Sequence, residues 1–249
     1  QSSRQRSVTR RTSQGAHSFG LITPHPRRAQ PEEVTGICFQ AVQAIQIEEF
    51  GGPENLKVVE VPDPVPGDGE VLVEVARSGI NFADTLARVG LYPEAPDPPC
   101  VMGYEVAGEI ESVGEGVTGY KPGDRVVAGT RFGGQAELVS VPEGQVLPLA
   151  DRLSYEQGAA IPVNYSTAYS GLVVMAGLKD GERVLIHAAA GGVGTAAVQI
   201  ARMLGAEVFG TSSASKHDAI RELGVTHAID YRTQDFEQEV IRITGGEGI

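Results

Sequence analysis

The chain has 249 residues, of which 20 are basic and 32 acidic, giving a formal net charge of −12, and 41% are hydrophobic. An acidic surface repels phosphate backbones, so the composition argues against a nucleic-acid-binding protein and favours small-molecule chemistry. The longest apolar runs fall well short of the ~20 residues that span a bilayer, so we expect no membrane helix. Cys38 and Cys100 are too few for a disulfide framework and indicate a reducing compartment, which predicts a cytoplasmic protein.

Residues 1–31 differ in composition from the rest of the chain. They hold six arginines, no acidic residue and only scattered apolar ones, so they cannot form a core. Without these arginines and without Glu32 and Glu33, 14 basic and 30 acidic side chains remain, a net charge of −16. We interpret residues 1–41 as a disordered basic tail. The alternatives are an organelle transit peptide or sequence upstream of the native start.

Residues 42–160 are predicted to form an antiparallel β domain. Glycines at 114, 116, 119 and 123 supply the dihedral angles of tight connections. Only residues 81–90 have helical spacing, with Phe82, Leu86 and Val89 on one face. The predicted strands are residues 44–47, 58–61, 70–76, 106–113, 125–128 and 137–141.

Residues 161–249 alternate between strand and helix patterns. Residues 183–190 are almost all apolar, which is typical of a central parallel strand buried on both faces. A glycine turn follows at 191–194, and the helix after it has one apolar face that includes Ala197, Ile200 and Leu204. Further strands are predicted at 207–211 and 226–231, with helices at 215–223 and 233–243. This βαβαβα order predicts a doubly wound, nucleotide-binding α/β sheet.

The turn after the first parallel strand matches the dinucleotide fingerprint. Ala189, Gly191 and Gly194 occupy its three glycine positions, for the tight turn, the close approach to pyrophosphate and the packing of helix on strand. We expect the backbone of Gly192 and Val193 to bind the pyrophosphate as well, because the helix begins there. The alternative is a glycine-rich helix start that serves packing only.

The end of the second parallel strand predicts which dinucleotide binds. An enzyme that uses NAD places Asp or Glu about 20 residues beyond the glycines to hold the ribose 2′-hydroxyl. Here Ser212, Ser213 and Lys216 stand in that neighbourhood and could bind a 2′-phosphate, which predicts NADPH. Lys216 could instead be a solvated charge, and Tyr231 could be either a core residue or a wall of the adenine pocket.

Residues 42–249 carry a series of motifs that resemble the medium-chain dehydrogenase/reductase superfamily, in its zinc-free quinone oxidoreductase branch. The resemblance implies a GroES-like β domain at 42–160, followed by a Rossmann domain at 161–249, with NADPH and substrate between them. Three further segments, PVNYSTAY (162–169), GTSSASKHDAI (210–220) and THAIDY (226–231), resemble the subgroup around the vesicle amine transport protein. The motifs for the branch are SGINFAD (78–84), GLYP (90–93), GYEVAG (103–108), VGEGV (113–117), GDRV (123–126) and HAAAGGVG (187–194).

The resemblance also implies roles for single residues. Asn81 would donate its side-chain amide to the substrate oxygen, Tyr92 or Tyr165 would supply a polar wall and a proton, and Thr167 would contact the nicotinamide. Asn81 could instead cap the helix that begins at Phe82, and the two roles can coexist, whereas Tyr165 could be a core aromatic. Zinc-dependent relatives have Cys at the position of Asn81 and His at that of Tyr104, so we expect no metal.

These features predict an NADPH-dependent reductase that transfers hydride to a quinone or another α,β-unsaturated carbonyl. The alternatives are a cofactor-binding interaction protein with weak or no turnover, and an enoyl-thioester reductase module. The sequence ends after three parallel strands, whereas a complete doubly wound domain has about six. We therefore expect a truncated Rossmann domain, from a protein of roughly 330 to 350 residues that forms a homodimer.

Overall fold

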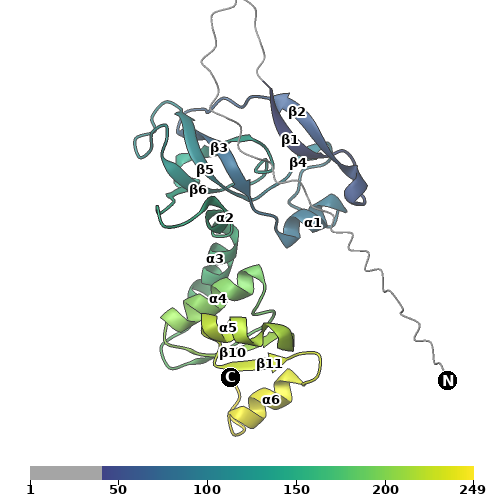
Figure 1. Cartoon of the computed structure of the whole chain (residues 1–249), viewed down its shortest axis with the longest axis vertical. Coiled ribbons are helices and arrows are strands. Elements are labelled where there is room, and N and C mark those ends of the chain that lie inside the picture. The colour runs from purple at the N-terminus through teal and green to yellow at the C-terminus, as the bar shows by residue number, and fades with distance from the viewer. Residues whose placement is uncertain (1–40) are drawn as a thin grey trace, which may run out of the picture. The chain divides into compact units, whose positions relative to one another are not determined.

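The computed structural model of the chain describes residues 41–249, so the tail predicted for residues 1–41 lies, except for Ala41, outside the described residues. Strands dominate the first part of the described chain, and strands and helices alternate in the second (Figure 1). Two antiparallel sheets come first along the chain, and a parallel sheet follows.

The larger antiparallel sheet has the strand order β7-β3-β5-β6-β8, and the smaller one has the order β2-β1-β4. Alternation along β3 places Val71 and Val73 in the core with Val106 and Val126, and all four side chains are fully buried. The predicted strands are confirmed. The sequence did not predict β4 and β8, because these two strands are too short to show alternation. The strands are β1 (Ala41–Ile47), β2 (Leu56–Pro62), β3 (Glu70–Ser78), β4 (Cys100–Val101), β5 (Glu105–Val113), β6 (Arg125–Gly129), β7 (Leu138–Pro142) and β8 (Val146–Pro148).

Helices are short in the antiparallel part. Helix α1 (Phe82–Arg88) is the predicted one; it begins after Asn81 and ends before Gly90, whose φ of 74° lies in the left-handed region. Helix α2 (Tyr155–Gly158) follows the last strand and begins with a capping box in which Ser154 and Gln157 exchange hydrogen bonds. Two 3₁₀ turns complete this part, η1 (Pro53–Asn55) and η2 (Glu143–Gln145).

The parallel sheet has the order β11-β10-β9, and helices separate its strands along the chain. Its buried core combines Ala196, Val198 and Ala201 of α4 with Val208 of β10 and Ile220 of α5. Small residues on α4 let the helix approach the sheet closely. The elements are α3 (Pro162–Tyr169), the π-helix η3 (Ser170–Met175), β9 (Arg183–Ile186), α4 (Gly192–Met203), β10 (Glu207–Ser212), η4 (Ala214–Lys216), α5 (His217–Leu223), β11 (His227–Asp230) and α6 (Phe236–Ile243).

The prediction for the first parallel strand is wrong in two respects. The strand β9 ends at Ile186 instead of continuing to residue 190, and it lies at the edge of the described sheet, with β10 in the centre. The chain turns after Ile186 because the next residues bind the side chain and backbone of Thr211 on β10. The apolar residues at 188–190 therefore belong to the turn, where Ala189 is fully buried.

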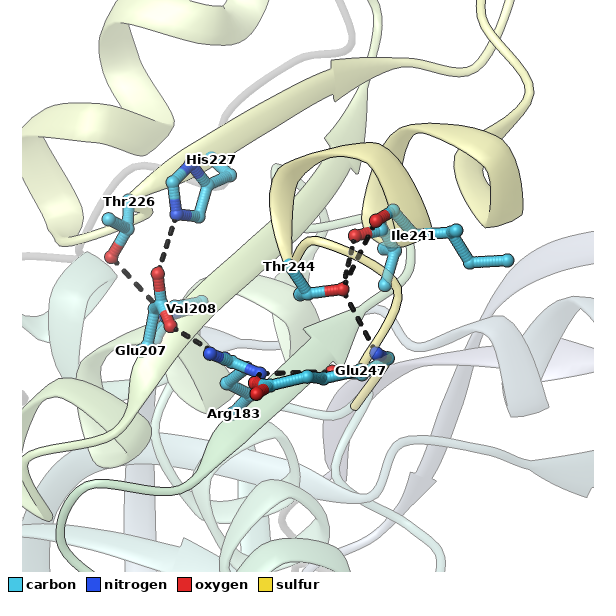
Figure 2. A network of polar contacts seen from close by, with 10 residues as sticks. Arg183, Glu207, Val208, Thr226, His227, Ile241, Thr244 and Glu247 are labelled. Carbon is cyan, nitrogen blue, oxygen red and sulfur yellow. Dashed lines mark hydrogen bonds and ion pairs between the residues drawn. The ribbon is translucent and has the colours of Figure 1, made fainter.

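A polar network joins the first residues of the three parallel strands (Figure 2). Glu207 of β10 accepts from Arg183 Nε of β9 at 3.0 Å, and its other oxygen lies 2.7 Å from His227 Nε2 of β11. Arg183 also donates to Glu247 at 2.9 Å, so the last residues of the chain are held against β9. Because the strands are parallel, this network lies at the opposite end of the sheet from the glycine turn.

Candidate cofactor and substrate site

The glycine turn after β9 is fixed to β10 by Thr211. Ala189 N donates to the Thr211 carbonyl at 2.9 Å, and Ala188 N donates to Thr211 Oγ1 at 3.2 Å. Ala188 has a φ of 50°, in the left-handed region that residues other than glycine rarely adopt. Backbone strain of this kind is found where a binding loop is held in one conformation.

Gly194 and Gly191 of the fingerprint differ in the space around them. A Cβ on Gly194 would lie 2.2 Å from the Ala188 carbonyl oxygen and 2.8 Å from Ala189 Cα, so only glycine lets α4 pack on the turn. A Cβ on Gly191 would meet only the Ala188 carbonyl oxygen, at 3.2 Å, and Gly191 is exposed. The side of Gly191 that would face a ligand is therefore open, whereas the side chain of Ala189 is in the core.

The N-terminus of α4 can hold an anion. Gly192 and Val193 are exposed in its first turn, and the first amides of a helix have no carbonyl partner earlier in the helix. These amides and the helix dipole suit the pyrophosphate of a dinucleotide. The turn and helix thus fit the predicted group.

The end of β10 presents hydroxyl groups and one cation. Ser212 is buried and donates to the Ser213 carbonyl at 3.1 Å, and Ser213 Oγ lies 3.2 Å from Ser215 Oγ. Lys216 is exposed, and its ammonium has no ion pair with any residue from 41 to 249. Tyr231 follows β11 and is 57% exposed, so the core alternative for it is wrong.

Asn81 is held by two buried carboxylates. Asn81 is the N-cap of α1, and its backbone N–H donates to Asp84 Oδ2 at 2.7 Å, as in a capping box. The capping role is therefore confirmed, and it can coexist with the predicted substrate contact. The side-chain Nδ2 of Asn81 donates to Glu105 Oε1 at 2.9 Å. The other oxygen of Glu105 accepts from Val163 N at 2.8 Å, and Asp84 Oδ1 accepts from Gly103 N at 3.1 Å. Burial raises the pKa of both carboxyl groups above their ordinary values.

The predicted tyrosines lie in different surroundings. The ring of Tyr92 packs edge-on against that of Tyr104, with 6.0 Å between the centroids. Burial raises the pKa of Tyr104 to about 12, and its hydroxyl has no hydrogen-bond partner among residues 41–249. Tyr165 packs against the core between α3 and α4, which favours the core alternative for it, whereas Thr167 on the same helix is exposed.

Helix α3 contacts both the Asn81–Glu105 pair and the start of helix α4. Val163 in its first turn binds Glu105, and Asn164 Oδ1 lies only 2.6 Å from the position that a Cβ on Gly192 would take. The helix also packs along α4. It thereby links the carboxylate that holds Asn81 to the helix start that would bind pyrophosphate.

Sequence reasoning missed four residues of this arrangement: Asp84, Glu105, Asn164 and Thr211. The spacing of Asn81 and Asp84 matches a capping box, which could have identified Asp84. Glu105 comes directly before the predicted strand 106–113, and no sequence pattern distinguishes a buried carboxylate from an exposed one. Among residues 41–249 no cluster of three or more His, Cys, Asp or Glu side chains could hold a metal ion.

Two family models match the chain. Residues 67–151 match the alcohol dehydrogenase GroES-like domain, and residues 192–249 match the zinc-binding dehydrogenase model. The curated relatives include the human synaptic vesicle membrane protein VAT-1 homolog, 46% identical over 198 residues that make up 78% of this chain and 50% of that protein. Human quinone oxidoreductase is 38% identical over 211 residues, 84% of this chain and 64% of that protein.

Solved structures of similar proteins share the fold. The human VAT-1 homolog-like protein aligns with a TM-score of 0.78 and 39% identity, over 82% of this chain and 65% of that one. Escherichia coli quinone oxidoreductase complexed with NADPH aligns with a TM-score of 0.75 and 37% identity, over 82% and 63%. CurK enoyl reductase aligns with a TM-score of 0.79 and 36% identity, over 84% and 65%.

These matches confirm the predicted fold class, a GroES-like β domain followed by a Rossmann-like parallel sheet. The chain spans about half the length of the curated relatives it first matches. In residues 41–249 no helix is both long and apolar enough to cross a membrane. The chain belongs to the medium-chain dehydrogenase/reductase superfamily, in the branch that contains quinone oxidoreductases and VAT-1 homologues.

Proposed function

We propose that the protein is a zinc-independent reductase that uses NADPH to reduce a quinone or another α,β-unsaturated carbonyl. The observation that carries the proposal is the end of β10, where Ser212, Ser213 and Lys216 lie beyond the glycine turn. The first acidic residue after β10 is Asp218, within α5. A 2′-phosphate would find hydroxyl groups and an ammonium that pairs with no carboxylate of residues 41–249, whereas a 2′-hydroxyl would find no Asp or Glu between Ser212 and His217.

When bound, NADPH supplies the hydride, and the protein orients the reactants and stabilises charge. The substrate gains two electrons and one hydrogen, and negative charge develops on its oxygen. The Asn81 amide has a second N–H that could stabilise this oxyanion, and Tyr92 or water would then supply the proton that completes the reduction. Thr167, exposed on α3, is the proposed nicotinamide contact.

Zinc independence is part of the proposal. The Nδ2 of Asn81 donates to Glu105, and the hydroxyl of Tyr104 has a pKa raised to about 12, so neither resembles the thiolate and imidazole ligands that zinc prefers. We expect metal analysis of the purified protein to find no stoichiometric zinc. One tightly held zinc ion per chain, lost together with activity on chelation, would contradict this part of the proposal.

The decisive experiment measures NADPH consumption with separate panels of quinones, enones and enoyl thioesters. We expect turnover with quinones or simple enones, and a slower rate with enoyl thioesters. Binding of NADPH without turnover of any substrate would replace the proposal with a cofactor-binding interaction protein. Turnover restricted to thioesters would replace it with an enoyl reductase, as in the similar CurK enzyme.

The cytoplasmic location and the homodimer stay predictions. Fractionation of cells that express the native protein tests the first, and recovery with vesicle membranes would contradict it. Light scattering coupled to size-exclusion chromatography tests the second, and a monomeric mass for the native protein would contradict it.

A further inference from the structure

Glu105 is a buried carboxylate, and the loss of folding stability that its burial causes needs an explanation. The residue is only 2% exposed, and no Lys, Arg or His from residue 41 onward forms an ion pair with it. A Cβ on Gly79 would lie 2.4 Å from Glu105 Oε1 and 2.7 Å from the Ala159 carbonyl oxygen, so the backbone of Gly79 packs closely against the carboxylate. Burying a carboxylate without a cation destabilises a fold, and a glutamine of the same size would carry no charge.

We infer that Glu105 is a positioning residue that fixes which end of the Asn81 side-chain amide faces the substrate oxygen. An ionised carboxylate can only accept hydrogen bonds, so it requires the amide nitrogen, and not the amide oxygen, to point toward it. One hydrogen of Asn81 Nδ2 binds Glu105, and the second remains for the substrate oxygen. The inference rests on the proposed function, because it assigns Asn81 to the oxygen on which charge develops.

The other contacts leave the amide little freedom. Asp84 holds the backbone N–H of Asn81 at 2.7 Å, and Asp84 is itself held by Gly103 N at 3.1 Å. Glu105 is held from its other side by Val163 N at 2.8 Å, and a backbone N–H cannot exchange its role. A rotation that swaps the amide nitrogen and oxygen would leave Asn81 Oδ1 facing Glu105, which the carboxylate opposes.

The variant Glu105→Gln tests this directly. Its Oε1 must face Val163 N, so its Nε2 faces Asn81 and favours the rotated amide, which presents an acceptor to the substrate oxygen. We expect kcat with NADPH and 1,4-naphthoquinone to fall by about 10- to 100-fold, a loss somewhat below that of removing an oxyanion donor outright. The Kd for NADPH should change by less than about twofold, because the hydrogen bonds to Glu105 come from Asn81 and Val163 and not from the glycine turn.

A double variant separates positioning from support of the fold. When Asn81→Asp is combined with Glu105→Gln, the introduced glutamine amide can donate to the new carboxylate and still accept from Val163 N. The melting temperature should therefore recover from that of Asn81→Asp alone. Activity should stay low, because position 81 no longer has a donor. Glu70→Gln is the matched control, since Glu70 also accepts two hydrogen bonds on a strand of the same domain, from Gly67 N and Ser140 Oγ.

A readout independent of turnover keeps this inference distinct from the proposed function. In ¹H–¹⁵N spectra of the whole protein, the side-chain amide of Asn81, assigned by its loss in Asn81→Asp, should shift strongly in Glu105→Gln. If the unaltered protein turns over nothing while this shift occurs, the proposed function fails and the contact stands without a catalytic use. Wild-type kcat in Glu105→Gln, or activity regained in the double variant, would overturn the positioning role.

Discussion

The ammonium group of Lys216 is the charge on which cofactor choice depends. It is exposed at the end of η4, beside Ser213, and pairs with no carboxylate of the described chain. Replacing Lys216 with Ala should weaken NADPH binding by about 1 to 3 kcal/mol through loss of a charge-assisted contact. The affinity for NADH should hardly change, since NADH has no 2′-phosphate.

Titration of nicotinamide fluorescence with both cofactors measures this selectivity. The matched control is Lys179→Ala, which removes a lysine from the loop before β9. Equal losses for NADPH and NADH in Lys216→Ala would show that the lysine does not read the 2′-phosphate.

At the level of single residues, the sequence predicted the backbone roles better than the side-chain contacts. Asn81 could be recognised as a helix cap because Asn is favoured there and an apolar helix face follows. Glu105 could not be recognised, because the groups that donate to its carboxylate, Asn81 Nδ2 and Val163 N, are 24 and 58 residues away in the sequence. Tyr165 and Tyr231 show the same limit, since the packing of α3 and the exposure after β11 decided between alternatives that spacing left open.

At the level of elements, replacing either of two glycines in the turn between β9 and α4 with alanine should affect a different property: folding stability for Gly194 and cofactor binding for Gly191. A Cβ on Gly194 would press on backbone atoms of Ala188 and Ala189, which cannot move without shifting the turn. Gly194→Ala should therefore lower the free energy of unfolding by about 1 to 3 kcal/mol. Gly191→Ala meets only one atom, at 3.2 Å, so it should leave stability nearly unchanged and weaken cofactor binding instead.

Urea unfolding and cofactor titration of the two variants measure the contrast. The same loss of stability in both variants would show that the turn is tight at Gly191 too. Unchanged cofactor affinity in Gly191→Ala would show that no ligand approaches this backbone.

The network at the other end of the sheet should make stability depend on pH. The hydrogen bond from His227, followed by that from Arg183, holds the pKa of Glu207 below its ordinary value of 4.5 (Figure 2). A carboxyl group whose pKa is lower in the folded state contributes stability above the unfolded-state pKa and loses it as pH falls through the folded-state pKa. Because the Glu207 side chain is 38% exposed, Glu207→Gln should cost at most about 1 kcal/mol at neutral pH.

Unfolding free energies of Glu207→Gln and the unaltered chain, measured from neutral to acidic pH, test this effect. The difference should shrink as the pH falls below 4.5 and should be absent for Glu222→Gln, an exposed carboxylate on α5. A difference that is constant with pH would exclude the ionised network as its source.

Periodicity predicted the longer elements from the spacing of their apolar residues, although in β3 Leu72 is buried as well as Val71 and Val73, so both faces of that strand are covered. Strand β3 and helix α4 follow from spacings of two and of three to four residues. The end of β9 could not be predicted, since the residues after it are as apolar as the strand and only the contacts with Thr211 make the chain turn. Hydrophobicity does not separate this turn from the strand, because Ala188 is exposed in it although Ala189 is fully buried.

At the level of the whole molecule, the two-part organisation could be predicted because the pattern changes from alternating strands to strand and helix near residue 160. The position of α3 could not be predicted from the sequence. Its eight residues contact Glu105 on one side and α4 on the other, and neither partner is near it in sequence. Contacts of this range decide how the predicted site residues relate to one another.

The same organisation leaves apolar side chains exposed beside the parallel sheet, and we predict that they bind a hydrophobic dye. Met175 of η3 is 84% exposed and Met203 of α4 is 85% exposed, and the two elements pack against each other. Strand β9 has only one neighbouring strand in the described sheet. Exposed apolar surface of this kind binds anilinonaphthalene sulfonate and promotes association.

The chain of residues 1–249 should therefore show dye fluorescence and a melting transition that depends on protein concentration. The double variant in which Lys replaces both Met175 and Met203 should show less dye fluorescence and a melting transition that depends less on protein concentration. Its NADPH affinity should be unchanged, because neither residue belongs to the glycine turn or the end of β10. Val65→Lys is the matched control, since Val65 is 84% exposed but lies in the antiparallel part. A dye signal that disappears in Val65→Lys and persists in the double variant would contradict this prediction, because it would place the exposed apolar surface that binds the dye in the antiparallel part.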